Sequence, residues 1–140
     1  MKNLLKSIML IVLLLMAVPV SSQVTQSYSQ CLTQYGSPTG TGLTDNGNFY
    51  CYYDEQYRTV QSGTYTHRKA LYFMTINNVS ICYSWRIYEP SSETNTNIIF
   101  YNSQFVTIGN LRWKDYTTGL IYDISMRDGL CVTEVWLDNN

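Results

Sequence analysis

Apolar and polar residues alternate most clearly in the stretch 79–88. The apolar set is Val79, Ile81, Tyr83, Trp85 and Ile87, with mostly polar residues between. A period of two places alternate side chains on opposite faces of a β-strand, so this stretch predicts a strand with one buried face. The preceding run 69–76 is also rich in β-forming residues, and Asn77-Asn78 separates the two runs.

The Asn77-Asn78 pair predicts a type I′ turn, because asparagine tolerates a positive φ. The two runs then form a β-hairpin whose register is set by the turn. In that register Ile76 opposes Val79, Met74 opposes Ile81 and Tyr72 opposes Tyr83.

A second hairpin is predicted at the C-terminal end, where Asp128-Gly129 separates the runs 120–127 and 130–137. Asp-Gly is a strong signal for a type I′ turn, and a two-residue turn fixes the register of both strands. One face then carries Leu120, Tyr122, Ile124, Met126, Cys131, Thr133, Val135 and Leu137, and the other carries Ile121, Asp123, Ser125, Val132, Glu134 and Trp136. Asp123 and Glu134 stand directly opposite each other, on the same face as Trp136.

Further turn signals recur at Asn46-Gly47, Ser62-Gly63 and Gly109-Asn110. No long stretch has the three-to-four spacing of an amphipathic helix, and residues 23–43 form the least regular part. Turns every ~8–12 residues between short strands are typical of antiparallel β folds. The sequence therefore predicts an all-β fold, a single small antiparallel β-sandwich or barrel-like domain of about seven to nine short strands.

The first 22 residues have the pattern of a secretory signal peptide. Lys2 and Lys6 form a positive start, residues 8–20 are predominantly apolar, and Ser22 is a small residue before the predicted cleavage point. The apolar run is shorter than the ~20 residues that span a bilayer, so a cleaved signal is predicted and no stable membrane anchor after processing. The predicted organisation is a signal peptide at 1–22 and one domain at 23–140. Its predicted location is secreted, periplasmic or at the cell surface.

Four cysteines, Cys31, Cys51, Cys82 and Cys131, follow the predicted signal. An even number in an exported chain predicts two disulfide bonds, with three pairings open. A metal site is not predicted, because the chain has no Cys-x-x-Cys pair and only one histidine.

Residues 23–140 contain seven basic and ten acidic residues, a formal net charge of −3. An acidic domain without a basic cluster is unsuited to nucleic acid. No phosphate-cradling glycine loop or calcium-loop spacing is present, so no cofactor is predicted. The single histidine, His67, has no nucleophile or orienting carboxylate at a recognisable spacing. We interpret it as a surface residue and predict no catalytic residue.

The facing carboxylates Asp123 and Glu134 form the first candidate site. Like charges in that position disfavour the sheet, so a bound cation, a raised carboxyl pKa or a bridging Arg or Lys is expected to compensate. Paired carboxylates near an aromatic ring are also the machinery of glycoside hydrolysis. A solvated or arginine-bridged pair is the simpler interpretation, with ligand binding as the alternative.

The thirteen tyrosines provide the second candidate. Tyr50 and Tyr52 flank Cys51 and share a face by alternation. Exposed rings on a sheet can stack against sugars or form a protein-binding patch, whereas buried rings only complete the core. The candidate ligand-binding residues are therefore Tyr50, Tyr52, Asp123, Glu134 and Trp136.

These features favour an exported, non-catalytic binding module that contacts a glycan or another protein. Three alternatives remain open. They are a small glycan hydrolase that uses Asp123 and Glu134, an inhibitor or immunity-type protein that acts through a polar loop at 91–97, and a structural envelope component.

Overall fold

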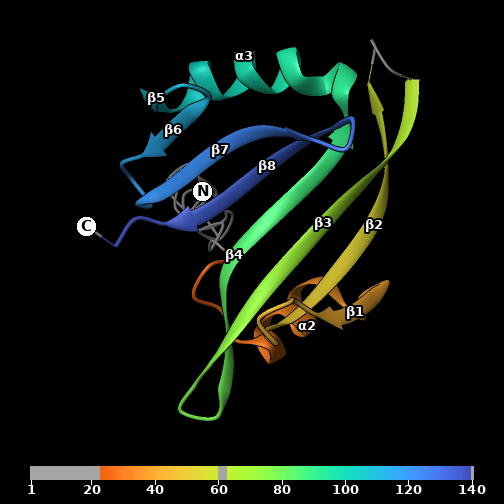
Figure 1. Cartoon of the computed structure of the whole chain (residues 1–140), viewed down its shortest axis with the longest axis vertical. Helices are drawn as coiled ribbons and strands as arrows, with labels where there is room; N and C mark the ends of the chain where they lie inside the picture. The colour runs from red at the N-terminus through yellow and green to blue at the C-terminus, as the bar shows by residue number, and fades with distance from the viewer. Residues whose placement is uncertain (1–22, 60–62, 140) are drawn as a thin grey trace, which may run out of the picture.

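The computed structural model describes residues 23–59 and 63–139, which form one antiparallel sheet and two α-helices (Figure 1). The strands are β1 (Gly40–Leu43), β2 (Phe49–Thr59), β3 (Gly63–Ile76), β4 (Val79–Pro90), β5 (Val106–Gly109), β6 (Arg112–Asp115), β7 (Leu120–Arg127) and β8 (Leu130–Leu137). The helices are α2 (Tyr28–Tyr35) and α3 (Thr94–Gln104), and a 3-10 turn, η1 (Ser91–Glu93), precedes α3. The predicted signal peptide and Ser62 of the Ser62-Gly63 turn lie outside the described residues.

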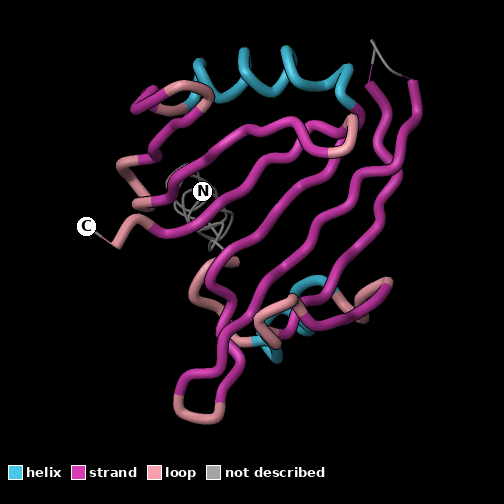
Figure 2. The backbone as a smooth tube through the Cα atoms, in the orientation of Figure 1, coloured by secondary structure: helices cyan, strands magenta, loops and turns pink. Residues whose placement is uncertain are grey.

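All eight strands belong to one sheet in the order β1-β2-β3-β4-β8-β7-β6-β5 (Figure 2). Every pairing is antiparallel, and β1 and β5 form the two edges. The predicted all-β, antiparallel class and the number of strands are therefore confirmed. Among the described strands, one connection skips its neighbours: it runs from β4 through α3 to β5 at the far edge, and β8 then lies between β4 and β7.

The two predicted type I′ turns are confirmed. Asn77 and Asn78 have φ of 49° and 63°, and Asp128 and Gly129 have φ of 51° and 76°. The register of the β7–β8 hairpin is the predicted one throughout, with Asp123 opposite Glu134. The turn between β5 and β6 lies one residue later than predicted, since Gly109 pairs with Arg112.

A β-bulge changes the predicted register of the β3–β4 hairpin. Ile76 opposes Val79 and Met74 opposes Ile81, as predicted, but Tyr72 pairs with Ser84 rather than with Tyr83. The extra residue on β4 exchanges the two faces of that strand beyond the bulge. The apolar set predicted for a single face is therefore divided, and the interpretation of 79–88 as one alternating strand is wrong at this point.

The structure contains two short helices, although no long stretch of the sequence has the spacing of an amphipathic helix. The helix α2 lies within the segment predicted to be irregular, and it begins with a capping box in which Ser27 and Gln30 satisfy each other's backbone N–H groups. The polar loop predicted at 91–97 is η1 and the start of α3. No helix of the described residues has the length and apolar character needed to cross a membrane.

The core lies on one face of the sheet, in two clusters. The first is beneath α2, where the Tyr28 ring packs edge-on against Phe49 and Phe73 at centroid distances of 4.9 and 5.4 Å. The second is beneath α3, where Tyr101 packs against Trp113 and Tyr122. One row of cross-strand partners joins the clusters: Cys51, Leu71, Trp85, Val135, Tyr122 and Trp113. Both helices therefore cover the same face.

The predicted disulfide bonds are not present, and all four thiols are free and buried. Cys31, Cys51 and Cys82 share the first cluster, whereas Cys131 lies in the second. Cys131 is thus separated from the other three, so two pairs cannot form in this arrangement. Burial raises the pKa of Cys51 to about 11 and that of Cys82 to about 12. These thiols behave as apolar core groups.

Replacing Gly129 by alanine is expected to destabilise the domain by about 1 kcal/mol, because its φ of 76° is unfavourable for a residue with a Cβ. Gly109→Ala is the matched control on β5. A Cβ at Gly109 comes no closer than 3.6 Å to another atom, so the change stays within about 0.5 kcal/mol. Urea unfolding followed by circular dichroism measures both, and equal losses would contradict the left-handed conformation at Gly129.

Candidate functional site

The sheet face opposite the two helices carries aromatic and charged side chains in rows that run across the strands. Directly paired residues of neighbouring strands share a face, so the register defines these rows. One row contains Tyr50, Tyr72, Ser84 and Trp136, and the next contains Tyr52, Ala70, Arg86, Glu134 and Asp123. We call this surface the open face. All five residues predicted to bind a ligand lie on it.

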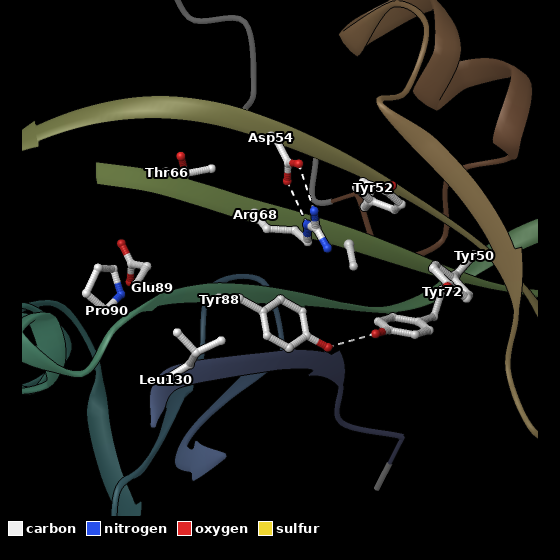
Figure 3. A pocket seen from close by; sticks show the side chains of 11 residues that line it. Tyr50, Tyr52, Asp54, Thr66, Arg68, Tyr72, Tyr88, Glu89, Pro90 and Leu130 are labelled. Carbon is white, nitrogen blue, oxygen red and sulfur yellow. Dashed lines mark hydrogen bonds and ion pairs between the residues drawn. The ribbon is translucent and has the colours of Figure 1, made fainter. Parts of the chain in front are cut away.

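A pocket of about 420 Å³ lies on the open face over β2, β3 and β4 (Figure 3). This volume is within the roughly 300–1,000 Å³ range of small-molecule sites. Tyr50, Tyr52, Tyr72 and Tyr88 line it, with the charged residues Asp54, Arg68 and Glu89. The predicted residues Tyr50 and Tyr52 therefore belong to a real concavity, whereas Asp123, Glu134 and Trp136 do not line it.

Glycines on β1 position the two predicted tyrosines. Gly40 pairs with Tyr52 and Gly42 with Tyr50, and each tyrosine ring lies against its glycine. A Cβ at Gly42 would come within 2.7 Å of the Tyr50 ring, so a larger residue there would displace that ring. On its other side Tyr52 is covered by the Arg68 guanidinium, 4.2 Å from the ring centroid.

The pocket tyrosines of β3 and β4 form a hydrogen bond with each other. The hydroxyl groups of Tyr72 and Tyr88 are 2.9 Å apart, as the dashed line in Figure 3 shows. The Arg86 guanidinium lies 4.8 Å from the Tyr72 ring centroid, and Tyr50 packs against the same ring at 5.7 Å. Burial raises the pKa of Tyr72, so its hydroxyl remains protonated and able to donate at neutral pH.

Arg68 and Asp54 form a two-point ion pair across β2 and β3 (Figure 3). Nε and Nη2 of Arg68 donate to the two carboxylate oxygens of Asp54 at 2.7 and 2.8 Å. The hydrogen bonds from Arg68 lower the pKa of Asp54, which is therefore ionised at neutral pH. The pair presents fixed donors and acceptors beside the tyrosine rings.

Glu89, at the end of β4, borders the pocket but belongs to the face that α3 covers, because it pairs with the core residue Cys131 and is bound by Asn97 of α3. It was not predicted as a site residue. It is 8% exposed and accepts hydrogen bonds from Tyr65 at 2.9 Å and from Asn97 at 2.6 Å. His67 lies 3.3 Å from it through Nδ1 and is 7% exposed, so the interpretation of His67 as a surface residue is wrong. Burial raises the pKa of Glu89, but the hydrogen bonds from His67, Asn97 and Tyr65 outweigh burial and lower it.

The facing carboxylates Asp123 and Glu134 are each paired with different arginines, in line with the simpler of the two interpretations made from the sequence. Arg112 Nε donates to Asp123 at 2.6 Å. Arg86 donates to Glu134 at 2.9 Å, and Arg127 lies 3.6 Å from its other oxygen. These cations offset the repulsion between the two carboxylates.

Trp136 lies next to this charged group on β8. The Arg112 guanidinium is 5.6 Å from its ring centroid. The structure thus divides the five predicted residues into two groups on one face, the pocket tyrosines and the Asp123–Glu134–Trp136 group. The charged and aromatic pocket residues that the sequence did not indicate are Asp54, Arg68, Tyr72, Tyr88 and Glu89, which only the strand pairing brings together.

No protein-family model matches the chain, and no curated protein or solved structure matches it. In residues 23–59 and 63–139, no group of three or more His, Cys, Asp or Glu side chains is arranged to hold a metal ion. The site itself presents rings that offer apolar contact and charged pairs that offer hydrogen bonds.

Glu89→Gln is expected to lower the free energy of unfolding by about 1–3 kcal/mol at pH 7, because it weakens a buried hydrogen-bond group. The folded pKa of Glu89 lies below the unfolded value of about 4.3. The stabilisation is therefore complete above pH 5 or so and is lost as the pH falls through the folded pKa. Urea unfolding between neutral and acid pH measures this loss, which should be smaller in the variant.

Asp45→Asn is the control for that series, since Asp45 is an exposed carboxylate in the β1–β2 loop. It should retain the acid dependence of the parent chain. An undiminished acid dependence in Glu89→Gln would assign the effect to other carboxylates.

Proposed function

We propose that the domain is an exported, non-catalytic binding module that recognises a glycan through the pocket on its open face. The observation that carries the proposal is the group of four tyrosines held around the Asp54–Arg68 pair in one concavity. Export follows from the predicted signal peptide at 1–22, which would be removed.

The chemistry of the pocket matches a sugar. A sugar ring has apolar C–H faces and a rim of hydroxyl groups, so it needs aromatic contact together with hydrogen bonds in fixed directions. Tyrosine rings supply the first, and the two-point Asp54–Arg68 pair and the tyrosine hydroxyls supply the second. Because these groups already contact one another, little side-chain freedom is lost on binding.

Binding fits the geometry better than hydrolysis does. A glycosidase needs one carboxyl group that keeps its proton and a partner carboxylate at the same substrate. In the pocket, Asp54 has a lowered pKa and both of its oxygens accept from Arg68. Asp123 and Glu134 lie outside the pocket and are held by arginines.

Tyr88→Ala and Tyr52→Ala are expected to weaken glycan binding about tenfold each, because each removes ring contact from the pocket. A polysaccharide array that includes glucans, mannans, xylans and galactans identifies the ligand for the mature domain. Titration calorimetry with that ligand then measures the variants.

Tyr116→Ala is the matched control, because Tyr116 is 67% exposed and does not line the pocket. It should bind as the parent chain does. Absence of glycan binding by the parent chain, or equal losses in all three variants, would overturn the proposal. Release of reducing sugar that Glu134→Gln abolishes would instead support the hydrolase alternative.

A further inference from the structure

The position of Trp136 extends the proposed site. We infer that the open face binds a linear, uncharged glycan chain that runs across the strands from the tyrosine pocket to a second aromatic subsite at Trp136. The inference rests on the proposed function and adds to it the class of ligand: a polymer of neutral sugars rather than a single sugar or an acidic one.

The register aligns the two subsites. Tyr72 on β3 pairs with Ser84 on β4, and Ser84 pairs with Trp136 on β8. Two strand spacings therefore separate the aromatic residues, about 10 Å in the direction across the strands. That separation is longer than one sugar ring, so a ligand that contacts both must contain more than one sugar unit.

The space between the subsites is suited to a chain that crosses it. Ser84 is the one residue between Tyr72 and Trp136 in this row; it is small and buried, 4% exposed, and its hydroxyl donates to Glu134 at 3.4 Å. The adjacent row contributes the Arg86–Glu134 ion pair, whose side chains remain 27% and 24% exposed. The surface between the rings therefore consists of the partly exposed Arg86–Glu134 pair over a buried serine, and it offers hydrogen-bonding groups to a chain that crosses it.

Charge pairing argues for an uncharged ligand. Each of the following cations on this side of the sheet is bound to a carboxylate: Arg68 to Asp54, Arg86 and Arg127 to Glu134, Arg112 to Asp123, and Lys114 to Asp138. An acidic sugar would have to displace one of these carboxylates from its arginine or lysine. A neutral sugar can accept from the remaining N–H groups and donate to the carboxylates without breaking a pair.

The test is the dependence of affinity on chain length. The probes are neutral gluco-, manno- and xylo-oligosaccharides from dimer to hexamer, with oligogalacturonides as the acidic series, titrated into the mature domain. Affinity for one neutral series should rise with length once both subsites are reached. Trp136→Ala should weaken hexamer binding about tenfold and leave dimer binding unchanged, whereas Tyr88→Ala should weaken both.

Phe100→Ala is the control for loss of an aromatic side chain, since Phe100 is 54% exposed on α3, the helix that covers the other face. It should bind as the parent chain does, and thermal unfolding confirms that each variant is folded. Length-independent affinity, equal weakening of dimer and hexamer by Trp136→Ala, or tighter binding of the acidic series would overturn the inference while leaving the pocket proposal standing. Failure of the parent chain to bind any series would overturn both.

Discussion

The bulge in the β3–β4 hairpin determines which side chains share each face of the sheet. Without the extra residue on β4, the turn register would place Trp85 opposite Ala70 on the open face and Arg86 on the core face. With it, Trp85 pairs with Leu71 in the core, and Arg86 pairs with Ala70 and Glu134 on the open face. A buried arginine without a partner is far more costly than a local irregularity in the ladder, so the bulge is the favourable solution. The Glu89–His67 contact depends on the same shift.

The distribution of core residues follows from this exchange of faces. Cys82 lies on the turn side of the bulge, where it pairs with Phe73 in the turn register, and it packs with Cys31 and Cys51 beneath α2. The helices α2 and α3 then bury the apolar row that crosses the sheet, and the opposite face is left with aromatic and charged groups. An antiparallel sheet commonly packs one face against the core and exposes the other face to solvent. This division leaves one broad surface that the two helices do not cover.

The sequence predicts the features that depend on local chemistry. Asn77-Asn78 and Asp128-Gly129 specify their turns because few residues adopt positive φ, and the β7–β8 register with its facing carboxylates follows directly from the second turn. The bulge has no such signal, because none of Cys82, Tyr83 and Ser84 is a glycine, the residue that often marks a bulge within a strand. Helix α3 also lacks one, because Ile99 and Phe100 are exposed and its apolar residues do not form a single stripe.

The sequence predicts only some of the site residues, because pairing between distant strands brings the others together. The facing carboxylates required a compensating cation, but the arginines that supply it come from β4 and β6, and that knowledge requires the strand order. The pocket tyrosines likewise come from three strands. Long-range pairing of this kind is set by the whole sheet rather than by any short segment.

The open face is stiff as well as exposed, and this bears on how it can bind. Tyr52 lies between Gly40 and the Arg68 guanidinium, and Arg68 is itself fixed by Asp54. Each group restricts the next, so the rings are already in place before a ligand arrives and the entropic cost of ordering them is small. On a surface of paired charges and fixed rings, any single ligand contact contributes little binding free energy, and several weak contacts made together contribute more. Such a surface favours an extended ligand over a compact one.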